Sequence, residues 1–245
     1  MSSRIRAFRP EDLADRPGRY FRRRYVWQWP VRIFHWVNAL CILVLFATGM
    51  YIAWPLLSPA GEAYQHFFMG RVRQVHFLFA FVFVINFLWR IYWFWMGNNY
   101  ARSGFPFFWK RDWWRDLFWQ IGDYLRLQRG HVHLGHNALG GLAYTLGAIV
   151  LGWMQIFTGF AMYSQSNPGG FFDRAVGWIA PMLGGLFQVH MWHHLFAWFF
   201  IVFSILHVYI VFYDGHQYRN GLVTSMVSGV KFYQEGDLDH DMWLS

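Results

Sequence analysis

Residues 188–213 form the stretch that most constrains the fold, because these 26 consecutive residues contain no Asp, Glu, Lys or Arg. A helix of about 20 predominantly apolar residues is long enough to cross a bilayer. The stretch nevertheless contains four histidines, His190, His193, His194 and His207. Since an ionisable ring is costly in hydrocarbon unless a partner satisfies it, these histidines are candidate functional residues.

Helical spacing separates the four histidines. At about 100° per residue, His193 and His207 point within about 40° of each other and lie about 21 Å apart along the helix axis. His194 diverges from His207 by about 140°, and His190 diverges by about 100°. A water-filled cavity or a helix-end position explains any single histidine equally well. The pair on one face instead favours two stacked haems, each taking one axial ligand from this helix.

Composition predicts that most of the chain lies in a membrane. Of the 245 residues, 56% are hydrophobic and 14% are charged, whereas about 25% of the residues in a soluble domain are charged. Proline breakers bracket one further apolar stretch, and two more stretches follow it. The four predicted membrane helices are residues 31–54, 72–96, 138–163 and 188–213. We therefore expect an all-α integral membrane protein, built as a four-transmembrane-helix bundle.

The single cysteine, Cys41, excludes an intrachain disulfide. The sequence also lacks the C-x-x-C-H motif of covalently attached haem and the cysteine clusters of iron–sulfur or zinc sites. Any haem would therefore be held non-covalently. The formal charge of +8 is attributed to membrane topology and anionic lipid rather than to nucleic acid. The N-terminus does not resemble a signal peptide, so the first apolar segment is expected to stay as an anchor.

The distribution of basic residues predicts the topology. Eighteen of the 21 Lys and Arg residues fall in the N-terminal arm, the 97–136 connection and the C-terminal tail, together with the helix ends beside them. Basic flanks remain in the cytoplasm, so both termini are expected to be cytoplasmic. The predicted parts are a basic cytoplasmic arm at 1–30, a haem-binding bundle at 31–213 and a cytoplasmic tail at 214–245.

This topology pairs histidines of different helices by depth. His35 and His207 are predicted near the cytoplasmic side, whereas His76 and His193 are predicted near the outer side. The depths come from the topology, and the spacing of His193 and His207 along the last helix is a separate observation that agrees with them. We therefore expect two b-type haems, each held between two histidines in a four-helix bundle. With both axial positions filled, such haems favour electron transfer over oxygen binding.

Several other segments carry weaker signals. The 97–136 connection mixes aromatic and charged residues, which predicts an amphipathic helix at the membrane surface. Arg90 is expected to extend toward the interface. His66 is interpreted as a solvated loop residue, and so is the H-V-H-L-G-H segment, because no acid or cysteine completes a metal cluster there; its histidines are His131, His133 and His136.

A short internal echo links the first and third helices. F-A-T-G-M-Y-I in the first resembles I-F-T-G-F-A-M-Y in the third. The echo places Gly49 and Gly159 where a flat ligand or a neighbouring helix approaches closely. Ordinary helix packing is the interpretation that we favour for both glycines.

Three motifs resemble those of a known family. They are R-I-F-H-W-V-N-A-L-C-I-L-V-L-F-A-T-G in the first helix, G-H-N-A-L-G-G-L-A-Y before the third, and G-L-V-T-S-M-V-S-G-V-K-F in the tail. Together with the histidines of the last helix, they resemble the b-type cytochrome subunits of membrane-bound [NiFe] hydrogenases. The resemblance covers residues 29–232. The wider family includes the cytochromes of formate dehydrogenase and thiosulfate reductase.

The resemblance implies a partner, cofactors and a location. The partner would be the iron–sulfur small subunit and the large subunit of a periplasmic hydrogenase at the bacterial inner membrane, and this chain would carry no catalytic centre. Electrons would pass through the outer and inner haems to a quinone. The resemblance implies His35, His76 and His207 as axial ligands, with His193, or alternatively His194, as the fourth. Candidate quinone residues near the cytoplasmic side are His136, Tyr218 and Arg219.

Two alternatives remain open. The first is the cytochrome b subunit of a formate dehydrogenase-type molybdoenzyme, which a copurifying partner would distinguish. The second is a haem-free transporter or membrane anchor. The scarcity of acidic residues within the predicted membrane helices argues against a proton-coupled transporter.

Overall fold

The computed structural model describes residues 21–56, 66–126 and 133–234. Four of its helical segments are long and apolar enough to cross a membrane. They are α1 (Trp29–Ala53), α2 (Phe68–Met96), the continuous segment α5 (Ala138–Tyr144), η3 (Thr145–Val150) and α6 (Leu151–Ser164), and α9 (Leu186–Tyr218). The prediction of an all-α protein with four transmembrane helices is confirmed.

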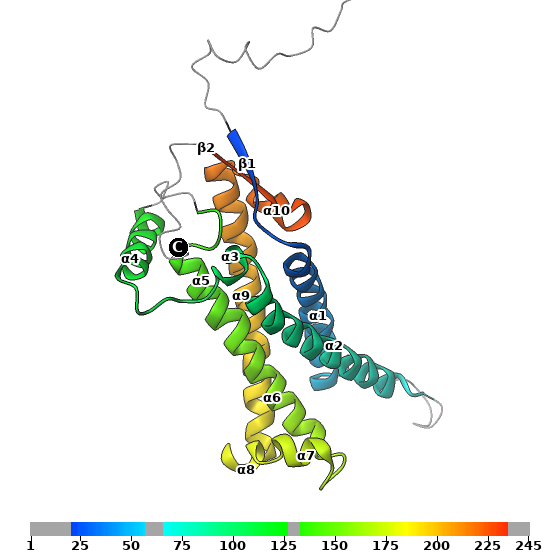
Figure 1. Cartoon of the computed structure of the whole chain (residues 1–245). Coiled ribbons are helices and arrows are strands. Elements are labelled where there is room, and N and C mark those ends of the chain that lie inside the picture. The colour runs from blue at the N-terminus through cyan, green and yellow to red at the C-terminus, as the bar shows by residue number, and fades with distance from the viewer. Residues whose placement is uncertain (1–20, 57–65, 127–132, 235–245) are drawn as a thin grey trace, which may run out of the picture.

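The membrane helices form two pairs. Helix α1 packs along α2, and α6 packs along α9. Figure 1 shows a small sheet and α10 (Leu222–Ser228) at one end of the molecule, and the short helices α7 (Phe171–Val176) and α8 (Ile179–Met182) at the other. The two ends are called the sheet end and the α7–α8 end below.

The third membrane segment contains a π-helical stretch, η3, that the sequence did not predict. Such stretches are rare and often lie at functional sites. Gly147 of η3 lies against α9, where an added Cβ would come 2.4 Å from the ring of Phe203. Glycine therefore allows a close approach of the two helices at this point.

Helix α9 continues five residues beyond the predicted end at position 213. It stops at Arg219, which has a φ of 51°, and Gly221 follows with a φ of 74°. Left-handed residues commonly end helices because they turn the chain out of the helical path. The last turn of α9 thus belongs to what the sequence suggested was a polar tail.

The arm and the tail fold together. Strand β1 (Phe21–Tyr25) pairs antiparallel with β2 (Val230–Gln234). Next to the sheet, the indole of Trp27 donates a hydrogen bond of 3.2 Å to the Ser225 hydroxyl, and the Arg32 side chain donates to the carbonyl of Val227. Both flanks of the bundle therefore lie at the sheet end.

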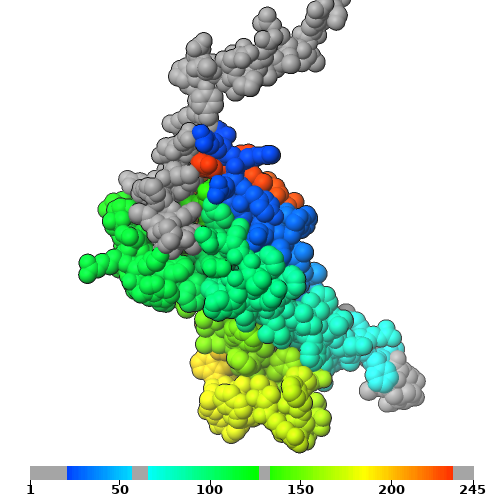
Figure 2. Space-filling model, viewed as in Figure 1, coloured from blue at the N-terminus to red at the C-terminus, as the bar shows by residue number. Residues whose placement is uncertain are grey.

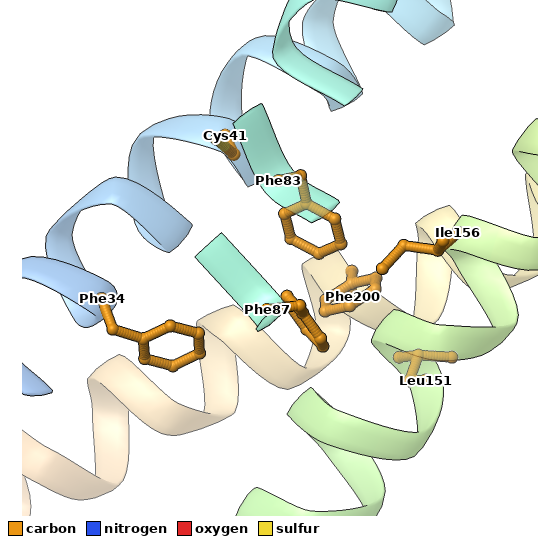
Figure 3. Packing of buried hydrophobic residues seen from close by; sticks show 7 residues of the cluster. All are labelled: Phe34, Cys41, Phe83, Phe87, Leu151, Ile156 and Phe200. Carbon is orange, nitrogen blue, oxygen red and sulfur yellow. The ribbon is translucent and has the colours of Figure 1, made fainter. Parts of the chain in front are cut away.

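A buried hydrophobic cluster fills the middle of the bundle (Figure 3). It joins all four membrane segments through Phe34, Cys41, Phe83, Phe87, Leu151, Ile156 and Phe200. Phe200 lies seven residues from both His193 and His207 along α9. The cluster is therefore an apolar layer between the two levels at which histidines were predicted to pair.

The 97–136 connection forms α3 (Asn99–Arg102) and α4 (Arg111–Arg126), which confirms that it contains a helix. Placement of α4 at the membrane surface remains a prediction. One face of α4 packs against the start of α5, where the Asp116 carboxylate accepts a 2.8 Å hydrogen bond from the backbone N–H of Ala138. A carboxylate at a helix N-terminus is stabilised by the helix dipole.

The expectation that Arg90 extends toward the interface is wrong. Arg90 is 6% exposed, and it donates hydrogen bonds to the Tyr144 hydroxyl at 2.8 Å and the Ala101 carbonyl at 2.6 Å. Its guanidinium also lies over the ring of Phe34. These neighbours, distant in sequence, hold the side chain inside the sheet end of the bundle.

Candidate functional site

A cavity of about 340 Å³ lies toward the α7–α8 end, lined by residues of α1, α2, α6 and α9. This volume is within the range of small-molecule and cofactor sites. Figure 2 shows a recess on the surface between the start of α2 (cyan) and the α7–α8 region (yellow). The cavity brings together His76, His190, His193 and His194. His76 and His193, the predicted outer pair, therefore line one cavity.

The two Thr-Gly pairs of the internal echo hold these two histidines. The hydroxyl oxygen of Thr48 lies 2.8 Å from Nδ1 of His76, and that of Thr158 lies 2.9 Å from Nδ1 of His193. A Cβ added at Gly49 would be 3.4 Å from Cε1 of His76, and one at Gly159 would be 3.1 Å from Cε1 of His193. The close approach expected at the glycines is thus that of a histidine ring from the neighbouring helix.

The other histidines of this cavity have different surroundings. The ring of His194 packs edge-on against Trp54 at 5.2 Å, and its Nε2 is buried without a hydrogen-bond partner in the described part of the chain. His190 lines the cavity although its side chain is exposed. His190 therefore lines the cavity even though its position on α9 diverges from that of His207 by about 100°. Nε2 of His193 lies 3.2 Å from the side-chain nitrogen of Gln155.

The predicted inner pair also meets. The ring centroids of His35 and His207 are 6.2 Å apart with an interplanar angle of 52°. Imidazoles on opposite sides of one metal ion, with metal–nitrogen bonds of about 2 Å and a ring radius of about 1 Å, have centroids about 6 Å apart. The observed separation therefore fits an iron between the two rings. Phe203 stacks on His207 at 5.9 Å, one turn away on α9.

The interpretation of His133 and His136 as solvated is wrong. His133 is buried, and its Nε2 lies 3.2 Å from Asp116 Oδ1. His136 contacts the Ser103 hydroxyl at 3.0 Å and stacks on Tyr144 at 5.4 Å. Their partners lie at the end of α3, in α4 and in α5. No group of three or more metal-ligating side chains occurs in the described ranges, and His131 lies outside them.

Burial lowers the pKa of His136 to about 3, and the nearby charges of Lys231 and Arg90 lower it further. The imidazole is therefore neutral at physiological pH. His66, in contrast, is exposed, as predicted.

The three candidate quinone residues do not share one described cavity. Tyr218 lines a small pocket with Tyr124 and Asp214, where the Tyr124 hydroxyl donates a 2.7 Å hydrogen bond to the carboxylate. Burial and the Asp214 carboxylate raise the pKa of Tyr124. Arg219 is the left-handed residue that ends α9. His136 lies instead beside Trp27, with ring centroids 5.1 Å apart.

Comparison with known proteins assigns a family. The sequence model of the prokaryotic cytochrome b561 family matches residues 26–229. The chain belongs to the prokaryotic cytochrome b561 family. This confirms the resemblance inferred from the sequence motifs, and the four membrane-spanning helices agree with it.

Several curated relatives extend this cytochrome b561 assignment. A probable Ni/Fe-hydrogenase B-type cytochrome subunit of Azotobacter chroococcum is 38% identical over 86% of this chain and 89% of the relative. The corresponding proteins of Cupriavidus necator and Escherichia coli K12 are 38% and 34% identical, covering 96% and 88% of this chain and 100% and 94% of the relatives. The match therefore extends over nearly the whole chain.

The sequence alone did not indicate the polar residues that contact the histidine rings of this cytochrome b561 family member. Thr48, Thr158 and Gln155 contact His76 or His193. The signal that pointed to the two threonines was the repeated Thr-Gly. The role of the repeated Thr-Gly could not be inferred without knowing which histidine ring lies against each helix.

Proposed function

We propose that this chain is a di-haem b-type cytochrome that anchors a periplasmic [NiFe] hydrogenase to the bacterial inner membrane and delivers the hydrogenase's electrons to membrane quinone. Its cytochrome family and the names of its relatives, which are hydrogenase B-type cytochrome subunits, support this proposal. When bound, each haem supplies reversible one-electron chemistry. The partner subunits would be the iron–sulfur small subunit and the large subunit.

The observation that carries the proposal is the arrangement of four histidines at two levels. The rings of His35 and His207 lie close together at the sheet end, with centroids 6.2 Å apart. His76 and His193 line one cavity toward the α7–α8 end. Because α9 supplies one histidine to each level, fourteen residues apart, the sites lie about 21 Å apart along its axis. The buried cluster around Phe200 separates them.

Each histidine pair would hold one haem, and a haem held by two histidines would supply electron transfer rather than substrate binding. The chemistry of hydrogen would therefore belong to the partner. His193 is the proposed fourth ligand, because its Nδ1 contact matches that of His76. His194, whose buried Nε2 has no partner in the described ranges, is the alternative.

The positive charge at the sheet end supports a cytoplasmic location for that end and for both termini. The cavity of His76 and His193 would then face the periplasm and receive electrons from the partner. Quinone would be reduced near the sheet end, where His136, Tyr218 and Arg219 are the candidate residues. The arm at 1–30, the bundle at 31–213 and the tail at 214–245 remain the proposed division of the chain.

The names of the relatives favour a hydrogenase over a formate dehydrogenase-type molybdoenzyme as the partner. Membership of a cytochrome family gives no support to a haem-free transporter or anchor.

The test uses the complex purified in mild detergent from cells that express the chain with its hydrogenase. Hydrogen should reduce the b-type haems, which is followed by the change in their absorbance spectrum. An added quinone should then reoxidise the haems. His76→Ala should keep the partner bound but abolish reduction by hydrogen, whereas the exposed His66→Ala should behave as the parent. Unchanged reduction by hydrogen in His76→Ala would contradict the proposed route.

A further inference from the structure

We propose that Thr48 and Thr158 are positioning residues that fix His76 and His193 in the tautomer with a free Nε2, and thereby lower the reduction potential of the haem between them. This inference rests on the proposed function, because it assumes that the two histidines hold a haem. It assigns a role to the Thr-Gly repeat, which the proposed electron route leaves unexplained.

The Thr48 hydroxyl donates its proton to backbone carbonyl oxygens of its own helix. Its Oγ1 lies 2.7 Å from the carbonyl oxygen of Val44 and 3.3 Å from that of Leu45, both in the preceding turn of α1. A carbonyl oxygen only accepts, so the single hydroxyl proton is donated within the helix. The 2.8 Å contact with Nδ1 of His76 must then be a hydrogen bond from the Nδ1–H to the hydroxyl oxygen.

The same arrangement recurs at Thr158. Its hydroxyl lies 2.7 Å from the carbonyl of Met154 and 2.9 Å from Nδ1 of His193. The hydroxyl proton again goes to the carbonyl of the preceding turn, so Nδ1 of His193 is the donor. One haem would thus be held by two rings that the same chemistry orients from two different helix pairs.

The side chain of Gln155 is compatible with the same tautomer. Its amide nitrogen lies 3.2 Å from Nε2 of His193. An amide nitrogen only donates, so Nε2 of His193 accepts and carries a lone pair. This agrees with the proton on Nδ1 that the Thr158 contact requires. Nε2, the nitrogen that carries this lone pair, is the one that could bind a metal in place of the Gln155 amide.

A hydrogen bond from the distal ring nitrogen makes an imidazole a more basic ligand. A more basic ligand stabilises the oxidised, more positively charged iron, which lowers the reduction potential. The inner pair differs, because Nδ1 of His35 is buried without a hydrogen-bond partner in the described part of the chain. The two threonines therefore favour electron flow from the outer level to the inner level.

The test compares variants of the complex by spectroelectrochemical titration of both haems, with low-temperature EPR of the oxidised state. Thr48→Val and Thr158→Val remove a hydroxyl at nearly constant volume, whereas Thr48→Ser keeps it. Loss of such a partner typically costs 10–100-fold in metal affinity. A tenfold loss confined to the oxidised state raises the potential by about 59 mV. Each valine variant should therefore raise the potential of the same haem and shift its EPR signal, while the serine variant should retain the parent values.

Thr145→Val is the matched control, because its hydroxyl donates to the carbonyl of Gly104 and not to a histidine. Unchanged potentials in Thr48→Val and Thr158→Val with two haems bound would overturn the inference. A shift of equal size in Thr48→Ser would also overturn it, because the methyl group would then be responsible. Loss of one haem in Thr48→Val but not in Thr48→Ser would support it. Absence of haem from the parent complex would instead refute the proposed function.

Discussion

Gly152 of α6 is expected to be intolerant of even a methyl group. A Cβ at this position would lie 2.2 Å from Cζ and 2.5 Å from Cε1 of Phe87. Phe87 is 1% exposed and is confined by Phe34, Phe83 and Trp153, with ring centroids 6.0, 4.6 and 6.0 Å away. The ring therefore has no free space into which it can retreat.

The size of the effect follows from two opposing terms. Overpacking a filled core costs about 1–3 kcal/mol, whereas replacing glycine by alanine inside a helix gains about 0.5–1 kcal/mol. Gly152→Ala should therefore lose roughly 1 kcal/mol of unfolding free energy, and at most about 2.5 kcal/mol. At about 2–4 °C per kcal/mol for a chain of this size, Tm should fall by roughly 2–4 °C, and by at most about 10 °C.

Gly122 of α4 is the matched control, because nothing lies within 4 Å of an added Cβ there. Gly122→Ala should gain about 0.5–1 kcal/mol and raise Tm by about 1–4 °C. The two alanine variants should thus shift Tm in opposite directions. Phe87→Leu in the Gly152→Ala background should recover part of the loss, because the two sites are in contact.

Cys41 provides the assay. It is the single cysteine, is 0% exposed and belongs to the same cluster as Phe87. A thiol-reactive fluorophore added to protein in detergent should therefore report unfolding of the bundle during a thermal ramp. An increase in Tm for Gly152→Ala equal to that of Gly122→Ala would refute the packing described for this cluster.

Three further predictions concern the histidines. His76→Ala should retain one haem per chain, measured as haem against protein, since the inner pair is unaffected. His193→Ala should likewise lose one haem while His194→Ala keeps both, and the reverse result would make His194 the ligand. Because the folded-state pKa of His136 is about 3 and the unfolded value about 6.5, protonation favours unfolding as pH falls below about 6.5. Between pH 7 and pH 5 this should cost about 2 kcal/mol, and thermal melts of His136→Gln should lack that part of the pH dependence.

The membrane helices could be predicted because their signal is local. A run of about 20 apolar residues is sufficient to indicate a spanning segment, and prolines mark the limits of the first. The histidine pairs followed from adding depth and helical phase to those runs. For His35 and His207 the structure brings the rings together.

The small sheet could not be predicted because its signal is not local. Strand β1 has the sequence F-R-R-R-Y, without the alternation of apolar and polar residues that indicates a strand. Its partner, β2, lies about 200 residues later in the chain. Pairing of the two strands depends on the membrane bundle bringing the flanks to one end.

The burial of His133 and the partial burial of His136 escaped prediction for the same reason. Their segment is polar and contains or adjoins glycines, a local composition that indicates a solvated loop. The partners that bury it, Asp116, Trp27 and Tyr144, come from other elements. The role of the two Thr-Gly pairs likewise depends on rings supplied by neighbouring helices.

The most direct test of haem binding by the two histidine pairs is a pyridine haemochrome assay on the complex purified from haem-replete cells, with haem counted against this chain. We expect about two non-covalent b-type haems per chain. One haem would mean that one of the two histidine pairs does not hold iron. A preparation that contains the folded chain and its partner but no haem would contradict the central claim.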